Sequence, residues 1–585
     1  MTRIAVVEKS KCNHIKCGDL CLKLCPVNRT GKDCIVLGED KKIIIDETLC
    51  TGCGICVNRC PFEAISIVNL PEELKTEPIH QYGRNGFHLY NLPVPKFGKV
   101  VGIIGRNGIG KSTAVKVLAG LLKPNLGNWE DENTGWDDVI KYFKGTEAQA
   151  YFEKVKDSQI KVSYKPQQIE LIPNAHKGTV KELLKKADEK GEINKITKEL
   201  DLEKFMDTDI SKISGGELQR VAIAATVLKK ADVYFFDEPT SFLDIKQRLR
   251  VSKFIRNLAD SKTAVMVIEH DLIILDYMAE LIHLMYGKQS VYGIVSQPKT
   301  TKAGINIYLN GYMKDENVRF RDQEIVFEER EPIKKTDTSL LTSWKDITTS
   351  LGKFKLKAPS GDIYNNQVIG ILGANGIGKT SFVRILAGVT KPDNGEVTEK
   401  VTVSYKPQYI DEKPDELVMN ILKDAIKKFD SMIIKPLDIK PLFTKKVNEL
   451  SGGELQKVAI AECLSKDADL YLLDEPSAYL DVEQRLKVSK IIRDIIEFRS
   501  ASALVVDHDI LFLDYLSHGL VVFDGEPAVH GIANGPFDMA DGMNMFLREI
   551  DMTFRRDEET KRPRVNKPDS VMDRKQKSEG NLYYA

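Results

Sequence analysis

The stretch KVVGIIGRNGIGKSTAVKVLAG, residues 99–120, decides the fold of the central part of this 585-residue chain. It reads as a buried strand, a glycine-rich loop and a helix. The glycines let backbone N–H groups approach phosphate oxygens, and the N-terminus of the following helix favours negative charge. The stretch QVIGILGANGIGKTSFVRILAG, residues 367–388, repeats this order. Two copies in matching context predict two nucleotide-binding α/β domains, each with a P-loop.

Four further motifs follow each P-loop in the same order. They are SYKPQ at 163–167 and 404–408, SGGELQ at 214–219 and 451–456, FFDEP at 235–239 and LLDEP at 472–476, and EHD at 269–271 and DHD at 507–509. The spacing along the chain between the two copies of each motif exceeds the roughly 20–50 residues of solenoid repeats. It therefore indicates tandem duplication of one domain. The first copy carries an insertion at about 128–157 that apolar spacing predicts to be a surface helix-loop-helix. A neutral decorated loop is the alternative.

Each copy holds the residue types that ATP hydrolysis requires. The P-loop lysine contacts the β- and γ-phosphates, the next hydroxyl reaches Mg²⁺, and an aspartate at a strand end helps to hold the ion. The glutamate after that aspartate is placed to accept a proton from the attacking water. The predicted phosphate-binding residues are Gly105, Asn107, Gly108, Gly110, Lys111, Ser112, Thr113, Gly373, Asn375, Gly376, Gly378, Lys379, Thr380 and Ser381. The predicted carboxylates are Asp237 and Asp474 for Mg²⁺ and Glu238 and Glu475 for catalysis.

Nine of the ten cysteines lie between Cys12 and Cys60, and the tenth is Cys463. Thiols clustered at one end of a large chain indicate metal binding rather than disulfides. The run CTGCGICVNRCP at 50–61 matches the bacterial ferredoxin spacing, and an earlier, wider-spaced set also ends in Cys-Pro. Two such runs, arranged as in two-cluster ferredoxins, predict two [4Fe–4S] clusters. Their ligands are Cys12, Cys17, Cys21 and Cys60 for one cluster and Cys25, Cys50, Cys53 and Cys56 for the other.

The remaining thiol of this region, Cys34, is predicted to be a buried non-ligand. Zinc is the alternative metal, although the spacing favours iron–sulfur. No flavin or pyridine-nucleotide fingerprint stands out downstream. Clusters that cross-link a small domain are therefore at least as well supported as clusters that transfer electrons.

The repeated motifs resemble those of the ATP-binding cassette (ABC) family. SGGELQ resembles the family signature, Gln167 and Gln408 its Q-loops, and the FLD and YLD at 242–244 and 479–481 its D-loops. The resemblance implies that both glutamines approach Mg²⁺ and that His270 and His508 are catalytic switch histidines. It also implies that the two cassettes meet head to tail. The implied composite sites are Lys111 with Ser451 and Gly453, and Lys379 with Ser214 and Gly216.

Adenine usually needs an aromatic platform. Tyr82 and Phe87 precede the first P-loop and are the candidates there, with Phe354 the candidate in the second copy. Ordinary packing of these rings is the alternative.

The combination of a two-cluster ferredoxin-like head, twin cassettes and an insertion in the first resembles the ribosome-recycling ATPases of archaea and eukaryotes, the RNase L inhibitor family. Residues 304–321 and 546–567 resemble the two hinges of that family. We therefore predict a multi-domain α/β fold with an α+β ferredoxin-like head. The expected boundaries are 1–72 for the head, 73–292 and 323–528 for the cassettes, 293–322 for the first hinge and 529–585 for the second hinge and tail.

The resemblance implies ATP-driven separation of ribosomal subunits, with cassette closure moving the iron–sulfur head. The implied partners are small-subunit RNA and protein, and a release factor or its rescue paralogue in the factor site, with initiation factors as a further candidate. The basic residues suited to phosphate contact are Arg319, Arg321, Arg555, Arg556 and Arg562. Their alternative is intramolecular pairing.

Composition excludes some classes of function and leaves others open. Lys plus Arg and Asp plus Glu both number 85, so global basicity gives no argument for nucleic-acid binding. No apolar run of about 18 residues and no secretory signal is present, so we expect a cytoplasmic protein without a membrane partner. The alternatives are an iron–sulfur electron-transfer ATPase, the ATPase subunit of a transporter and an antibiotic-resistance-type translation ATPase. The absence of a nuclear-localisation run or long extension favours an archaeal source.

Overall fold

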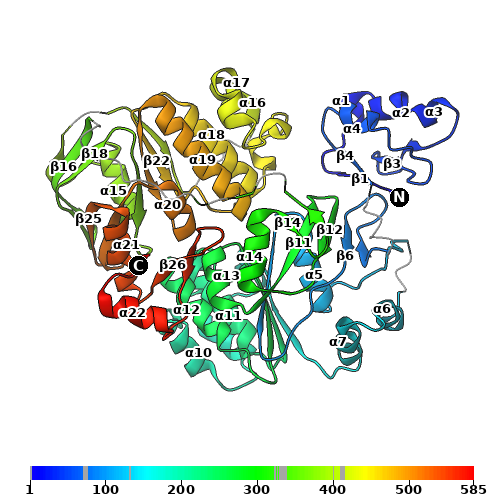
Figure 1. The fold of residues 1–585 in the computed structure, drawn as a ribbon, viewed down its shortest axis with the longest axis horizontal. Coiled ribbons are helices and arrows are strands. Elements are labelled where there is room, and N and C mark those ends of the chain that lie inside the picture. Colours follow the sequence, from blue (N-terminus) through cyan, green and yellow to red (C-terminus); the bar gives the residue numbers. More distant parts are fainter. Residues whose placement is uncertain are drawn as a thin grey trace.

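The computed structural model describes residues 3–69, 77–130, 134–321, 324–325, 327, 339–398, 401–408 and 415–584 (Figure 1). Two α/β halves lie side by side, and a small N-terminal lobe stands on the first of them. The domain boundaries predicted after residues 72 and 322 lie outside the described residues.

Each half is built around five parallel strands in the same spatial order, β8-β9-β10-β7-β11 in the first and β21-β22-β23-β19-β24 in the second. The first set is β7 (Val100–Gly105), β8 (Val162–Lys165), β9 (Val233–Asp237), β10 (Ala264–Ile268) and β11 (Leu281–Lys288). The second set is β19 (Val368–Leu372), β21 (Val403–Lys406), β22 (Leu470–Asp474), β23 (Ser502–Val506) and β24 (Gly519–Glu526). Their apolar runs are buried on both faces, as parallel strands covered by helices require.

Further strands extend both sheets, and most of their pairings are antiparallel. In the first half they are β5 (His80–Gln81), β6 (His88–Tyr90), β12 (Tyr292–Val295) and β13 (Lys299–Thr300). In the second half they are β16 (Leu340–Leu351), β17 (Phe354–Ala358), β18 (Gly361–Tyr364), β20 (Asn394–Val397) and β25 (His530–Asp538). The pairs β6–β12 and β17–β25 are parallel.

The helices also match in pairs, each pair following the same motif. They are α5 (Lys111–Leu118) and α15 (Lys379–Leu386) after the P-loops, and α11 (Gly215–Leu228) and α18 (Gly452–Ser465) in the signatures. The other pairs are α12 (Ile245–Arg256) and α19 (Val482–Arg499) after the D-loops, and α13 (Leu272–Met278) and α20 (Ile510–Leu516) after the switch histidines. Shorter helices are α8 (Ile172–Ala175), α9 (Val180–Ala187), α10 (Ile193–Glu199), α16 (Val418–Ile421) and α17 (Lys423–Lys428).

The insertion in the first half contains two helices, α6 (Trp136–Tyr142) and α7 (Glu147–Lys156). Phe152 is fully buried and stacks on Phe143. The hydroxyl of Tyr151 donates to the Leu118 carbonyl at 2.7 Å, which ties α7 to the end of the P-loop helix.

The N-terminal lobe consists of two short sheets and four short helices. They are β1 (Arg3–Val7) with β4 (Ile65–Asn69), β2 (Ile35–Leu37) with β3 (Ile43–Ile45), and α1 (His14–Cys17), α2 (Leu20–Leu24), α3 (Pro26–Arg29) and α4 (Ile55–Arg59).

The lobe docks on the first half through Asn85. The Asn85 side chain accepts from Ile45 N at 2.8 Å and donates to the carbonyls of Ala5 at 2.8 Å and Ile45 at 3.0 Å. Ile4 and Val6 of β1 pack beside it against Tyr90 and other apolar residues of the first half. This contact holds the lobe in the position seen in Figure 1.

Asn85→Ala is expected to weaken this docking by about 3 kcal/mol, because it leaves buried backbone groups of the lobe unsatisfied at about 1–3 kcal/mol each. Hydrogen exchange at β1 measures the effect, and exchange should accelerate. Asn91→Ala is the control, since Asn91 also has a positive φ (60° against 54°) but is exposed. Equal exchange in the two variants would contradict the docking role.

The C-terminal segment is folded onto both halves. After α21 (Met539–Glu549) it forms β26 (Phe554–Arg556), β27 (Pro563–Val565) and α22 (Val571–Glu579), and Tyr583 is buried. The segment predicted as the first hinge, between the two halves, contains α14 (Thr301–Asn310), β14 (Tyr312–Met313) and β15 (Val318–Arg319). The Asn306 side chain joins the two regions, since its Nδ2 donates to Asp557 at 3.1 Å and to Glu559 at 2.7 Å.

Two of the arginines predicted to contact phosphate are buried, so that prediction is wrong for them. Arg562 is 0% exposed and pairs with Asp276. Arg321 pairs with Glu483 and donates to the Tyr308 carbonyl. Intramolecular ion pairs, which the charge pattern alone does not distinguish from a surface patch, account for both.

Candidate functional sites

The P-loops form two closely similar cradles. Lys111 Nζ donates to the carbonyls of Gly105 and Arg106, both at 2.8 Å, and Lys379 makes the two equivalent bonds in the second half. Gly110 has φ +90°, and an added Cβ would lie 2.8 Å from the ring of Phe87. Only glycine therefore fits the turn into α5, where Ser112 and Thr113 occupy the first helical turn.

The carboxylates of the first site lie at the end of β9. Asp237 is buried, and Tyr164 donates to it at 3.3 Å. Glu238 Oε1 accepts from Gln167 Nε2 at 2.7 Å and lies 3.4 Å from His270 Nε2. The structure therefore brings the predicted general base, Q-loop and switch histidine together around one carboxylate.

The second site repeats this arrangement. Glu475 Oε1 accepts from Gln408 Nε2 at 2.7 Å and lies 3.6 Å from His508 Nε2. Thr380 Oγ1 donates to Asp474 at 2.8 Å, as a P-loop hydroxyl and an aspartate that share one Mg²⁺ would.

The two sites differ around their glutamates. Ser241 Oγ donates to the second oxygen of Glu238 at 3.2 Å, whereas Ala478 occupies the equivalent position in the second half. Burial raises the pKa of Glu238, but the hydrogen bond and charge of His270 outweigh burial and hold this pKa at about 2. Burial and the adjacent Asp474 raise the pKa of Glu475 above its ordinary value.

These pKa directions predict different pH dependences. A general base works only when ionised, so Glu238 stays competent well below pH 5, while Glu475 loses competence first as the pH falls. In Glu475→Gln protein, where only the first site can turn over, the rate is expected to be flat from pH 8 to 5. In Glu238→Gln protein, where only the second site can turn over, the rate should begin to fall at a higher pH than in Glu475→Gln protein. Rates that fall at the same pH in both variants would contradict this difference.

The D-loop aspartates join the halves head to tail. Asp481 Oδ2 accepts from the P-loop amide of Asn107 at 3.1 Å, and Asp244 Oδ2 accepts from that of Asn375 at 3.0 Å. The Arg106 side chain adds an ion pair with Glu483 at 2.7 Å. Each P-loop is thus contacted by the D-loop of the opposite half.

The signature serines do not bond to the opposite P-loops in the described part of the chain. Ser214 and Ser451 instead cap their own helices, each accepting from a glutamate amide at 3.4 Å. Gly216 and Gly453 lie in the first turn of these helices against the D-loop carbonyls of Phe242 and Tyr479.

The aromatic side chains predicted to stack on adenine lie beside the P-loops. The hydroxyl of Tyr82 is 3.2 Å from Thr113 Oγ1, and Phe87 packs on Gly110. Phe354 makes the corresponding contact with Gly378.

Sequence reasoning missed a pair of buried lysines. Lys165 Nζ donates to the backbone carbonyls of Asp237 and Glu238, at 2.9 and 3.3 Å, and Lys406 bonds to the equivalent carbonyls in the second half. Burial lowers the pKa of each to about 8. Their place in the repeated SYKPQ motif was the available signal.

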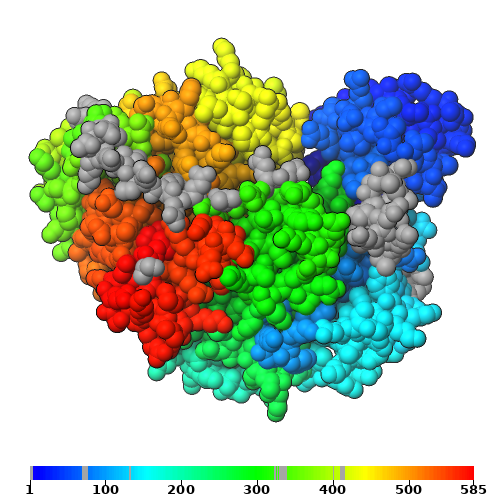
Figure 2. All heavy atoms as spheres, in the orientation of Figure 1, coloured from blue at the N-terminus to red at the C-terminus, as the bar shows by residue number. Residues whose placement is uncertain are grey.

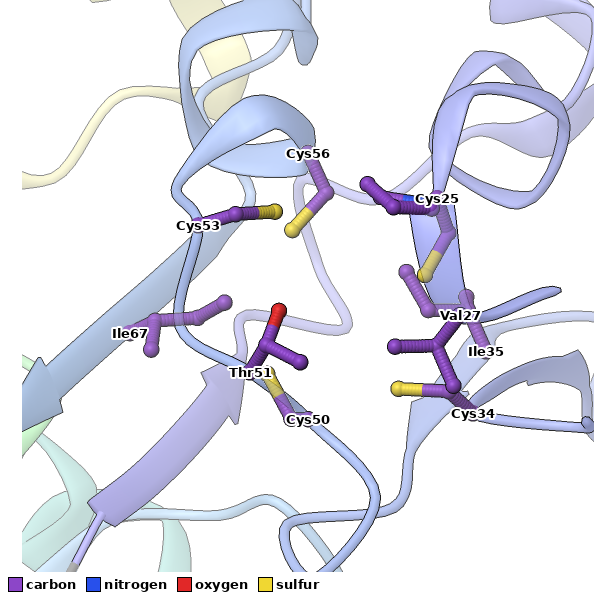
Figure 3. Close-up of a pocket in the computed structure, with 10 residues that line it drawn as sticks. Cys25, Val27, Cys34, Ile35, Cys50, Thr51, Cys53, Cys56 and Ile67 are labelled. Atoms are coloured by element: carbon purple, nitrogen blue, oxygen red, sulfur yellow. The ribbon is translucent and has the colours of Figure 1, made fainter. Parts of the chain in front are cut away.

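The cysteines of the lobe form two groups. Cys25, Cys50, Cys53 and Cys56 line one cavity with Cys34, and Figure 3 shows the side chains of Cys25, Cys53 and Cys56 projecting into it. Cys12, Cys17 and Cys60 surround Cys21. Burial, with the neighbouring thiols, raises the pKa of Cys21 to about 12 and that of Cys56 to about 11. Such crowded thiols suit a cationic iron cluster that would stabilise their thiolates.

The described residues also limit single-ion metal sites and membrane-spanning helices. Among them, no three His, Cys, Asp or Glu side chains lie close enough to hold a single metal ion. None of the described helices is both long enough and apolar enough to span a membrane.

Comparison with known proteins identifies the family. The chain matches the ABC transporter family over residues 91–241 and 356–478, and the 4Fe-4S binding domain family over residues 43–66. It is 44% identical to the translation initiation factor RLI1 of Saccharomyces cerevisiae, over 100% of this chain and 98% of that protein. The chain belongs to the ABCE1, or RNase L inhibitor, family of ABC ATPases.

Solved structures agree with this membership of the ABCE1 family. A structure described as ribosome-bound archaeal Pelota and ABCE1 superposes with a TM-score of 0.93 at 52% identity, covering 100% of this chain and 99% of that one. A complex of the archaeal ribosomal stalk protein aP1 with the ribosome recycling factor aABCE1 gives 0.83 at 52% identity, covering 87% and 99%. The predicted fold class, ATPase activity, use of ATP and Mg²⁺, and binding of a 4Fe-4S cluster are confirmed.

Proposed function

We propose that this protein is a cytoplasmic ribosome recycling factor that uses ATP to separate the large and small ribosomal subunits. The observation that carries the proposal is the crossed pair of D-loop contacts, Asp481 to Asn107 and Asp244 to Asn375, combined with an iron–sulfur lobe docked on one cassette. Cassettes joined in this way convert ATP binding into closure, and a lobe fixed to one of them moves with it. One similar structure is described as ribosome-bound ABCE1, and another is named as a ribosome recycling factor; both support the same function.

The site residues take the following roles in this proposal. Lys111 and Lys379, with the P-loop amides, bind the β- and γ-phosphates. Glu238 and Glu475 each take a proton from the attacking water. The Q-loop glutamine and the switch histidine hold each of these carboxylates in place. On closure the signature residues Ser451 and Gly453 reach the first γ-phosphate, and Ser214 and Gly216 reach the second.

Two kinds of group complete the chemistry. Mg²⁺, held by Ser112, Gln167 and Asp237 in one site and by Thr380, Gln408 and Asp474 in the other, would neutralise phosphate charge. Two [4Fe–4S] clusters, on the two cysteine groups of the lobe, would cross-link about 70 residues that have only a small core of their own. The proposed domain boundaries are the ones predicted from the sequence.

The proposed partners are small-subunit RNA and protein, the release factor or its rescue paralogue, and initiation factors. Arg319 and Arg555 are exposed and Arg556 is half-buried, which leaves them able to contact phosphate. The insertion helices α6 and α7 offer a second contact surface on the first cassette.

Pelleting with isolated small subunits tests the partner directly. The account predicts that the protein pellets with small subunits when a non-hydrolysable ATP analogue is present and much less when nucleotide is omitted. Equal pelleting under the two conditions, or none, would count against the proposal.

A further inference from the structure

The two switch helices carry aspartates at equivalent positions. The sequences DLIILDYM at 271–278 and DILFLDYL at 509–516 align without a gap, which places Asp276 on α13 and Asp514 on α20. Each helix begins directly after the segment that contains His270 or His508. A force on either aspartate is therefore transmitted to a switch histidine by one short helix.

The C-terminal segment, residues 550–584, grips the first of these aspartates with two arginines. Arg564 binds Asp276 in a fork, with Nε to Oδ2 at 2.8 Å and Nη2 to Oδ1 at 3.1 Å. Arg562 Nη1 adds a third bond at 3.2 Å. The Asp276 carboxylate is 4% exposed, so these are charge-assisted bonds shielded from water.

The same segment grips the second aspartate with its last two tyrosines. The hydroxyls of Tyr583 and Tyr584 both donate to Asp514, the latter at 3.3 Å. Arg556 lies over the Tyr584 ring at 4.1 Å and holds it in place.

Buried hydrogen bonds make the part between these grips rigid. Phe554 N donates to the Leu582 carbonyl at 2.7 Å, and Tyr584 N donates to the Phe554 carbonyl at 3.2 Å. Thr553 Oγ1 donates to Asp573 at 2.7 Å, and Gln576 Nε2 donates to the Phe554 carbonyl at 2.9 Å. Figure 2 shows this segment in red at the junction of the two halves. A rigid body attached to both switch helices cannot follow one of them without acting on the other.

We propose that Asp276 and Asp514 are positioning residues through which the C-terminal segment couples the two switch histidines, so that loosening either attachment lowers turnover at both ATP sites. The inference rests on the proposed role of the switch histidines in ATP hydrolysis. The coupling leaves the chemistry at each site unchanged. It makes the position of His270 depend on the position of His508, and the position of His508 depend on that of His270.

The test is a variant cycle in the full-length, cluster-loaded protein. Asp276→Asn weakens one grip and the double variant Tyr583→Phe/Tyr584→Phe removes the other. Each is measured in Glu475→Gln protein, which reports the first site, and in Glu238→Gln protein, which reports the second. We expect either change to lower kcat about threefold at both sites with KM for ATP unaltered. We also expect the combination to be no worse than one change alone.

Arg574→Ala is the matched control, because Arg574 is exposed on α22 of the same segment. It should leave kcat at both sites unchanged. Effects confined to the nearer site, multiplicative effects in the combination, or unchanged kcat would each overturn the coupling.

His270→Ala and His508→Ala are measured in parallel. If they lower turnover while the segment variants do not, only the coupling fails; if they too leave turnover unchanged, the proposed switch role fails with it.

Discussion

Replacing both Glu238 and Glu475 with glutamine is expected to lower ATP turnover by at least about 100-fold, because a positioned general base contributes about 10²–10⁴-fold. Each carboxylate lies between its Q-loop glutamine and its switch histidine at the end of a buried strand. Glutamine has nearly the same shape but cannot take the proton from water. ATP binding should therefore persist, and the closed state should accumulate.

Steady-state phosphate release and retention of labelled ATP after gel filtration measure the two effects. The control is the double variant Glu199→Gln/Glu497→Gln, which makes the same change at exposed glutamates of α10 and α19. Turnover within about twofold of the parent in Glu238→Gln/Glu475→Gln protein would rule out these glutamates as the bases.

Cys53→Ser is expected to remove one cluster and to abolish subunit separation, by more than about tenfold, while ATP binding is retained. Cys53 lies in the group with Cys25, Cys50 and Cys56, and serine is a poor ligand for iron–sulfur clusters. Iron content should fall from about eight to about four atoms per chain. The lobe would lose one of its two cross-links and could no longer transmit force from the cassettes.

Cys34→Ser is the matched control, since Cys34 is a buried thiol of the same cavity that the account leaves unligated. It should keep its iron and its activity. Loss of iron in Cys34→Ser, or normal subunit separation by Cys53→Ser, would contradict the ligand assignment or the mechanical role of the lobe.

The repeated motifs predicted the cassettes well because each motif has a local cause. A strand that must be buried, a glycine that must take positive φ and a helix that must start at a phosphate leave little freedom, and β7, Gly110 and α5 follow directly. The comparison of two copies inside one chain also located the insertion, where the structure has α6 and α7.

Features that depend on contacts distant in sequence were harder to predict. Nothing local in RRDEETKRPRVNK distinguishes Arg562, which is buried on Asp276, from the exposed Arg555, because their environments are set by α13 nearly 300 residues earlier. No sequence motif marked Asn85, yet it docks the lobe on the first half. The polar tail offered few apolar residues, and it folds because it shares the surface of both cassettes.

The gradient profile of ribosomes carrying a release factor in the factor site tests the central claim most directly. The ribosomes are mixed with this protein and ATP and separated by sedimentation. The account predicts conversion of whole ribosomes to large and small subunits, lost when ATP is omitted and lost with Cys53→Ser protein. Whole ribosomes that persist while the protein hydrolyses ATP at its normal rate would contradict it.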